Sequence, residues 1–270
     1  MEPAYESWKT PNNYRAYPGG KELPDQLKVW RVQNSGKTYG SVVSFSYGFE
    51  DSPDAEVLIP CFNSSKESGA VGVGRHGNYL QWGFSASPAN MTEAGKCFFL
   101  NCICYIHKFD GFAPLVHVSS SQRMNAVRLA LLLDRITDPR FQTNTFPANL
   151  RRQFSGNPEG LAKYYQDRIE LIYRDKVYLA DEDLPLLGLK SNRTLETLQR
   201  LIGLLDQPTQ QEAARKLLRR YTSESFETAK EWRDWFDQNS QRIFFTDVGG
   251  YKFIAAPANY PIRSGSLLRE

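Results

Sequence analysis

The segment from Gly69 to Gly111 constrains the fold more than any other part of this 270-residue chain. Apolar residues alternate with glycine or polar residues on both sides of Arg75-His76-Gly77-Asn78. Such alternation is typical of a strand with one buried face, and glycine and asparagine favour a tight turn. We therefore expect a β-hairpin whose strands include residues 71–73 and 80–84.

A helix is expected directly after this hairpin. Ser87-Pro88 and Met91-Thr92-Glu93 supply a capping hydroxyl, a first-turn proline and an acid near the positive end of a helix. The apolar residues that follow are Phe98, Phe99, Cys102, Ile103, Tyr105 and Ile106. They cover much of the circumference, so we expect the helix to be packed on more than one side. Gly111 is expected to end it in a left-handed conformation.

Composition narrows the class of protein. The chain is 41% hydrophobic and 13% aromatic, which is enough for a sizeable core in one or two domains. A net charge of +3 does not indicate a nucleic-acid partner. No apolar run reaches the roughly 18 residues of a membrane-spanning helix, and the first residues lack the layout of a signal peptide. The sequence leaves the compartment undetermined.

The rest of the chain divides into segments of different character. Residues 1–28 are rich in proline and glycine without periodicity, which indicates an extended arm or a linker, as if a preceding part had been lost. Residues 29–115 form the hairpin-and-helix module, with further strand fragments at 28–32, 42–45 and 56–59. Residues 116–257 are mainly helical, and residues 258–270 are expected to form a loose tail.

Within the helical module, apolar periodicity and breakers give the expected elements. Ser119–Ser121 can cap a helix over 124–136, and Pro147 and Pro158 open two more, the second reaching about Tyr173. A short strand is expected at 177–179, then a helix pair over 195–218 and a helix over 226–239. Two apolar runs around Asp247-Val248-Gly249-Gly250 predict a final β-hairpin. The expected fold class is therefore α+β, a β-hairpin and helix module followed by a mainly helical module that ends in a hairpin.

Motifs for cofactors and metals are weak. Gly72-Val73-Gly74-Arg75-His76-Gly77 fits the GxGxxG pattern, but a strand follows it where a dinucleotide fold requires a helix. Three of the four cysteines lie on one predicted helix, at positions 97, 102 and 104, so small core residues are the favoured interpretation. We assign no cofactor and no metal.

The turn between the two predicted strands is the favoured candidate site. His76 lies there beside Arg75 and Asn78, with Trp82 on the following strand. A polar cluster with an aromatic floor could bind a sugar or a sugar acid, and a solvated turn is the competing interpretation. His76 is the weak candidate for a catalytic base, with Arg75 as anion holder and Glu93 or Asp110 as a possible partner acid.

Two segments resemble a known family. Residues 70–111, AVGVGRHGNYLQWGFSASPANMTEAGKCFFLNCICYIHKFDG, resemble the closing strand-strand-helix part of ThuA-like domains, within the class I glutamine amidotransferase-like superfamily. Residues 227–253, ETAKEWRDWFDQNSQRIFFTDVGGYKF, are similar to the end of a group of uncharacterised bacterial proteins that share that part.

The resemblance implies a partial flavodoxin-like layer in residues 29–115, a carbohydrate-associated role and relatives that are often exported. No residue matches the amidotransferase cysteine, so the resemblance implies no catalytic residue.

Three functions stay open at this point. The first is a non-catalytic binding or interaction protein of a ThuA-like, carbohydrate-associated system, with a sugar-type ligand or a protein partner. The second is an enzyme acting on a sugar or an oxidised sugar derivative through the turn at residues 75–78. The third is a helical adaptor that uses residues 119–240 and predicts an exposed apolar patch there.

Overall fold

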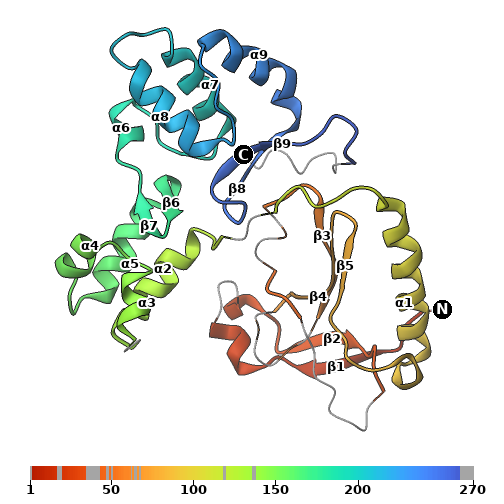
Figure 1. The fold of residues 1–270 in the computed structure, drawn as a ribbon. Coiled ribbons are helices and arrows are strands. Elements are labelled where there is room, and N and C mark those ends of the chain that lie inside the picture. Colours follow the sequence, from red (N-terminus) through yellow and green to blue (C-terminus); the bar gives the residue numbers. More distant parts are fainter. Residues whose placement is uncertain are drawn as a thin grey trace. The chain divides into compact units, whose positions relative to one another are not determined.

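The computed structural model describes residues 2–16, 20–34, 43–46, 49, 51–61, 63, 66, 68–117, 120–135 and 138–261. The chain forms two compact units, Met1–Leu115 and Val116–Glu270, called unit 1 and unit 2 below. Small antiparallel sheets and separate helices make up both units, so the predicted α+β class is confirmed (Figure 1). Residues 42, 119 and 136, which take part in predicted elements, lie outside the described residues.

The described residues of unit 1 form five strands and one α-helix. The strands are β1 (Tyr5–Lys9), β2 (Gln26–Trp30), β3 (Ala55–Cys61), β4 (Ala70–His76) and β5 (Tyr79–Trp82), and the helix is α1 (Glu93–Ile106). Short 3-10 turns are η1 (Asn12–Ala16), η2 (Gly20–Glu22), η3 (Pro88–Asn90) and η4 (His107–Phe109).

The first 28 residues differ from the expected extended arm. β1 pairs antiparallel with β2, so that Trp8 lies opposite Leu27, and η1 and η2 fill the connection. The Arg31 guanidinium covers the Trp8 ring at 5.0 Å. β1 has only five residues, with Tyr5, Ser7 and Lys9 exposed and Glu6 and Trp8 half-buried, so it lacks the apolar alternation of a strand with one buried face.

The predicted central hairpin is present. β4 is the middle strand of the sheet β3-β4-β5, and both of its pairings are antiparallel. A flavodoxin-like layer is built from parallel strands, whereas the described strands of unit 1 pair antiparallel. Every residue of β4 before His76 is buried, so both faces of this middle strand are covered.

Helix α1 begins as predicted, ends at Ile106 before the 3-10 turn η4, and is covered on one side only. Thr92 caps it by accepting a hydrogen bond from the Gly95 amide at 3.0 Å, and Gly111 adopts a φ of 83° soon after its end. The helix lies beside β5 (Figure 1). The expectation of packing on more than one side is wrong, because Leu100 and Ile103 are 61% and 48% exposed.

Unit 2 contains eight α-helices and two β-hairpins within its described residues. The helices are α2 (Met124–Leu131), α3 (Pro139–Thr143), α4 (Ala148–Gln153), α5 (Pro158–Asp167), α6 (Asp183–Leu186), α7 (Leu195–Leu204), α8 (Gln211–Tyr221) and α9 (Ala229–Asn239). The strands are β6 (Ile172–Asp175), β7 (Val177–Ala180), β8 (Ile243–Thr246) and β9 (Lys252–Ala255), and 3-10 turns are η5 (Leu133–Arg135), η6 (Ile169–Leu171) and η7 (Ser240–Arg242).

One hairpin of unit 2 was not predicted in full. The helix expected to reach Tyr173 ends at Asp167, and β6 follows it and pairs with β7. The turn of this hairpin places Lys176 at a φ of 61°, a position where glycine or asparagine would have signalled a turn. The final hairpin of β8 and β9 confirms the prediction from the Gly249-Gly250 turn.

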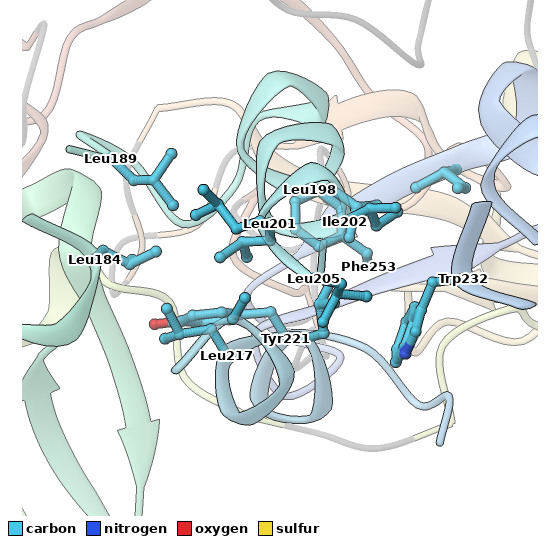
Figure 2. Close-up of a cluster of buried hydrophobic side chains, with 14 residues drawn as sticks. Leu184, Leu189, Leu198, Leu201, Ile202, Leu205, Leu217, Tyr221, Trp232 and Phe253 are labelled. Carbon is cyan, nitrogen blue, oxygen red and sulfur yellow. The ribbon is translucent and has the colours of Figure 1, made fainter. Parts of the chain in front are cut away.

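Two hydrophobic clusters formed by described residues stabilise unit 2. One joins α7, α8, α9 and the final hairpin, and Figure 2 shows it with Trp232 at one end and Leu184 and Leu189 at the other. The second joins α2, α4, α5 and the hairpin of β6 and β7 around Tyr165 and Tyr178. Tyr173 and Phe245 pack against both clusters, so the two cores are continuous through these residues. In the expected tail, Tyr260 is buried, and residues 262–270 lie outside the described residues.

Candidate functional site

The turn of the central hairpin consists of two residues, Gly77 and Asn78, because His76 pairs directly with Tyr79. Gly77 has a φ of 57°, and a Cβ there would lie 2.6 Å from the Pro114 nitrogen. The chain therefore requires glycine here for both conformation and space. The turn is held against the segment that follows α1.

His76 faces a buried carboxylate. Its Nε2 lies 3.6 Å from Asp54 Oδ1, and Nε2 makes no hydrogen bond to any described residue. Asp54 is fully buried and accepts hydrogen bonds from the Leu115 amide at 2.9 Å and from the Ser52 hydroxyl. Burial by itself raises the pKa of Asp54, but these donors and the imidazole outweigh it and lower the pKa to about 2. The carboxyl group is therefore ionised at neutral pH.

The acid beside His76 is thus neither of the two that the sequence suggested. Glu93 pairs with Lys96 at 2.6 Å on the surface of α1. Asp110 pairs with His107 at the end of the same helix. Asp54 is 22 residues from His76 in sequence, and it reaches the imidazole because β3 and β4 are paired, with Ala55 opposite His76.

Arg75 is not available as an anion holder. Successive side chains of a strand point to opposite faces, so Arg75 points away from His76 into the interior. Its Nε donates to Glu56 Oε1 at 2.9 Å and its Nη1 donates to the Gly77 carbonyl at 3.0 Å. The guanidinium also lies 3.8 Å from the centre of the Phe109 ring. This buried ion pair anchors the hairpin, so the predicted role of Arg75 is wrong.

Trp82 does not form a floor beneath His76. Its ring lies 5.1 Å from Phe84, 5.7 Å from Phe98 and 4.9 Å from Phe99, within the layer between β5 and α1. Asn78 is exposed at the turn. The four predicted ligand-binding residues therefore occupy different surroundings, and only His76 and Asn78 reach the surface at the turn.

A surface that sequence reasoning missed lies on α1. Gly95, Phe98, Phe99, Cys102 and Ile106 face the protein, whereas four apolar side chains on the opposite side are exposed, and these are Cys97, Leu100, Ile103 and Cys104. We call these four residues the outer face of α1. The spacing of 97, 100 and 104 repeats every three and four residues, which is the signal that could have revealed a second stripe.

Exposed apolar residues also occur in unit 2. Met124 and Leu131 lie on α2, and Leu132 follows directly. Arg128 is exposed between Met124 and Leu131 and interrupts the stripe with a charge. The outer face of α1 has no such interruption between Cys97 and Cys104, so it is the longer apolar surface.

Among the described residues, no group of three or more histidine, cysteine or acidic side chains is placed to hold a metal ion. No described helix combines the length and the hydrophobicity that crossing a membrane requires.

Comparison with known proteins adds no assignment. No protein-family model matches the chain, and no curated protein or solved structure matches it at a significant level. The resemblance to ThuA-like domains therefore stays a prediction from the sequence.

Proposed function

We propose that this chain is a non-catalytic interaction protein that binds a protein partner through the outer face of α1. The supporting observation is the exposure of Leu100 and Ile103, 61% and 48%, on a helix whose opposite side is already packed. Scattered apolar residues are normal on surfaces, but four on one side of a 14-residue helix form a contiguous strip. Covering that strip removes apolar area from water, at about 25 cal/mol per Å².

The contacts made by the predicted turn residues also favour an interaction role. Arg75 is held in a buried ion pair, and Trp82 belongs to the aromatic layer under α1. A carbohydrate site normally combines a few converging polar groups with an apolar surface in a concavity. Of residues 75–78 only His76 and Asn78 reach the surface, beside the exposed Tyr79, and the interaction role does not depend on this turn.

The two exposed cysteines allow coverage of the outer face of α1 to be measured before the partner is identified. Cys97 and Cys104 lie on the outer face, whereas Cys102 is buried and its pKa is raised to about 11 by burial. Thiolates react with alkylating reagents and buried thiols do not, so Cys102 serves as the internal control. We would measure the alkylation rate of each cysteine by mass spectrometry, in dilute pure protein and in an extract of the cells that produce it.

We expect Cys97 and Cys104 to react quickly in dilute pure protein and to be slowed together, by about tenfold or more, where the partner is present. Leu100→Lys should abolish this protection, because a charge in the strip must be desolvated on binding. Lys163→Leu, a change on the exposed surface of α5, is the matched control and should leave the protection intact. Equal rates under all conditions would refute the interaction role.

A second candidate function is general-base catalysis at His76. It is favoured by the buried Asp54 carboxylate, which could hold the imidazole in one orientation and leave Nδ1 for a substrate. To test it, the ring signals of His76 would be followed by NMR during titration with sugars and sugar acids. Saturable shifts that Asp54→Asn removes would favour this candidate, and unchanged signals would exclude it for these ligands.

A further inference from the structure

We propose that the partner of the outer face of α1 is a second copy of this chain, packed antiparallel about a two-fold axis between Leu100 and Asn101. This inference rests on the proposed function and specifies its partner. The surface, the distribution of charge and the positions of the two thiols each support it.

The geometry of the strip suits helix pairing. Cys97, Leu100 and Cys104 follow the spacing of three and four residues that forms the seam of paired helices. Residues seven apart lie within about 20° of each other around a helix, so Cys97 and Cys104 point in nearly the same direction. Leu100 lies between them along the helix, on the same side. Ile103 widens the strip on one side.

The charges at the ends of the strip favour a second copy in the antiparallel orientation. Glu93 is exposed in the first turn of α1, and Lys108 is exposed in η4 just beyond its last turn. An antiparallel pair places Glu93 of each copy near Lys108 of the other, and it opposes the two helix dipoles. A parallel pair would place Glu93 against Glu93 and Lys108 against Lys108. The strip is therefore complementary to itself in one orientation only.

Existing contacts do not prevent this pairing. In one copy Glu93 pairs with Lys96 of its own helix, and the Lys108 ammonium lies 5.6 Å from the Tyr105 ring centre. Exposed contacts of this kind contribute little to stability, so they can be exchanged for contacts with the second copy. A 14-residue helix is about 21 Å long and offers a small interface, so the dimer should be weak and dependent on concentration.

The thiols lie symmetrically about the same axis. Positions 97 and 104 have their midpoint between residues 100 and 101, as do positions 93 and 108. An antiparallel pair therefore brings Cys97 of each copy towards Cys104 of the other. Within one helix these two cysteines are about 10 Å apart along the axis, too far for an internal disulfide.

Oxidative cross-linking tests this arrangement. With diamide as the oxidant, one thiol from each copy loses a proton and an electron, one S–S bond forms, and diamide is reduced to the hydrazine. We expect a covalent dimer of the full chain that contains a peptide linking Cys97 to Cys104. Cys97→Ser and Cys104→Ser should each lose this product by about tenfold or more. A mixture of the two variants should regain it, because each supplies the thiol that the other lacks.

The controls separate this arrangement from others. Cys61→Ser removes a half-buried thiol on β3 and should leave cross-linking unchanged. Cross-linking that persists in either single variant would indicate a parallel pair or random collision and would overturn the proposal. Failure of the mixture to regain the product would also overturn it.

Sedimentation velocity supplies an independent readout. The average mass of the pure chain should rise with concentration. Glu93→Lys and Lys108→Glu should each weaken association about fivefold, from the two symmetric contacts that each change makes repulsive. The double variant should restore it, because the pairs re-form with reversed charge.

The mass of the pure chain and the protection of its thiols together distinguish failure of the dimer from failure of the interaction role. The pure chain could stay monomeric at every concentration while its thiols are protected in the extract. The partner would then be another protein, which overturns the dimer and keeps the interaction role. Protection that persists in dilute pure protein would assign the face to another part of the same chain and overturn the dimer. If both thiols react equally fast in pure protein and in the extract, the dimer and the interaction role are both overturned.

Discussion

Arg123 binds Asp247 across 124 residues of sequence within unit 2. Arg123 Nη2 donates to Oδ1 at 2.6 Å, Nε donates to Oδ2 at 2.9 Å, and the Arg123 amide donates to Oδ2 at 2.9 Å. A further donor, Nη1, bonds the Ile169 carbonyl at 3.0 Å and Asn192 Oδ1 at 3.1 Å. One buried guanidinium thus joins the start of α2, the turn η6 and the final hairpin.

Removal of one member of this pair should destabilise unit 2 strongly. Asp247→Leu leaves a buried guanidinium without its counter-ion, at a cost of about 3–5 kcal/mol. Asp234→Leu breaks the exposed pair with Lys230 and should cost less than about 1 kcal/mol. The measurement is urea unfolding followed by hydrogen exchange of unit 2 peptides. Equal shifts for the two variants would contradict the role of the pair.

Asp54 should make the stability of unit 1 depend on pH under acidic conditions. Its pKa is lowered from 3.8 to about 2, so the folded state favours the ionised form. This contribution, about 2 kcal/mol, is fully present above pH 3.8 and is lost as the pH falls through 2. Urea unfolding of unit 1 between pH 2 and pH 5 should show the slope, and Asp54→Asn should remove it. A variant with the same slope as the native chain would exclude Asp54 as its source.

Two glycines should respond oppositely to alanine. Gly77→Ala places a Cβ at a φ of 57° and 2.6 Å from the Pro114 nitrogen, so we expect a loss of more than about 1 kcal/mol. Gly203 lies within α7 with no atom within 4 Å of its added Cβ. Gly203→Ala should stabilise unit 2 by about 0.5–1 kcal/mol. Chemical denaturation measures both, and a stabilising Gly77→Ala would show that the turn can relax.

The N-terminus of α9 depends on a capping box. The Thr228 hydroxyl accepts a hydrogen bond from the Glu231 amide at 3.2 Å, and the Glu231 carboxylate accepts one from the Thr228 amide at 2.8 Å. Thr228→Ala should cost about 1 kcal/mol. At the start of α8, Gln210 makes no capping hydrogen bond with its side chain, so Gln210→Ala is the matched control with little expected effect. The two melting temperatures, compared by calorimetry, check this difference.

The sequence by itself determined features that depend on neighbouring residues. The hairpin around Gly77, the cap of α1 at Thr92 and the final turn at Gly249-Gly250 follow from local backbone preference and from apolar periodicity. These preferences act over a few residues, and for that reason they can be read without knowledge of distant contacts. The hairpin with Lys176 in its turn was missed because that residue gives no such local signal.

Only the tertiary structure decided which side chains meet. The sequence analysis grouped Arg75 and His76 at one turn, whereas in the structure both belong to β4, where Arg75 pairs with Glu56 and His76 faces Asp54. Periodicity shows that apolar residues cover much of the circumference of α1, but not that one side of the helix stays uncovered. The physical reason is that burial and ion pairing depend on segments brought together by strand pairing, at separations that no local preference specifies.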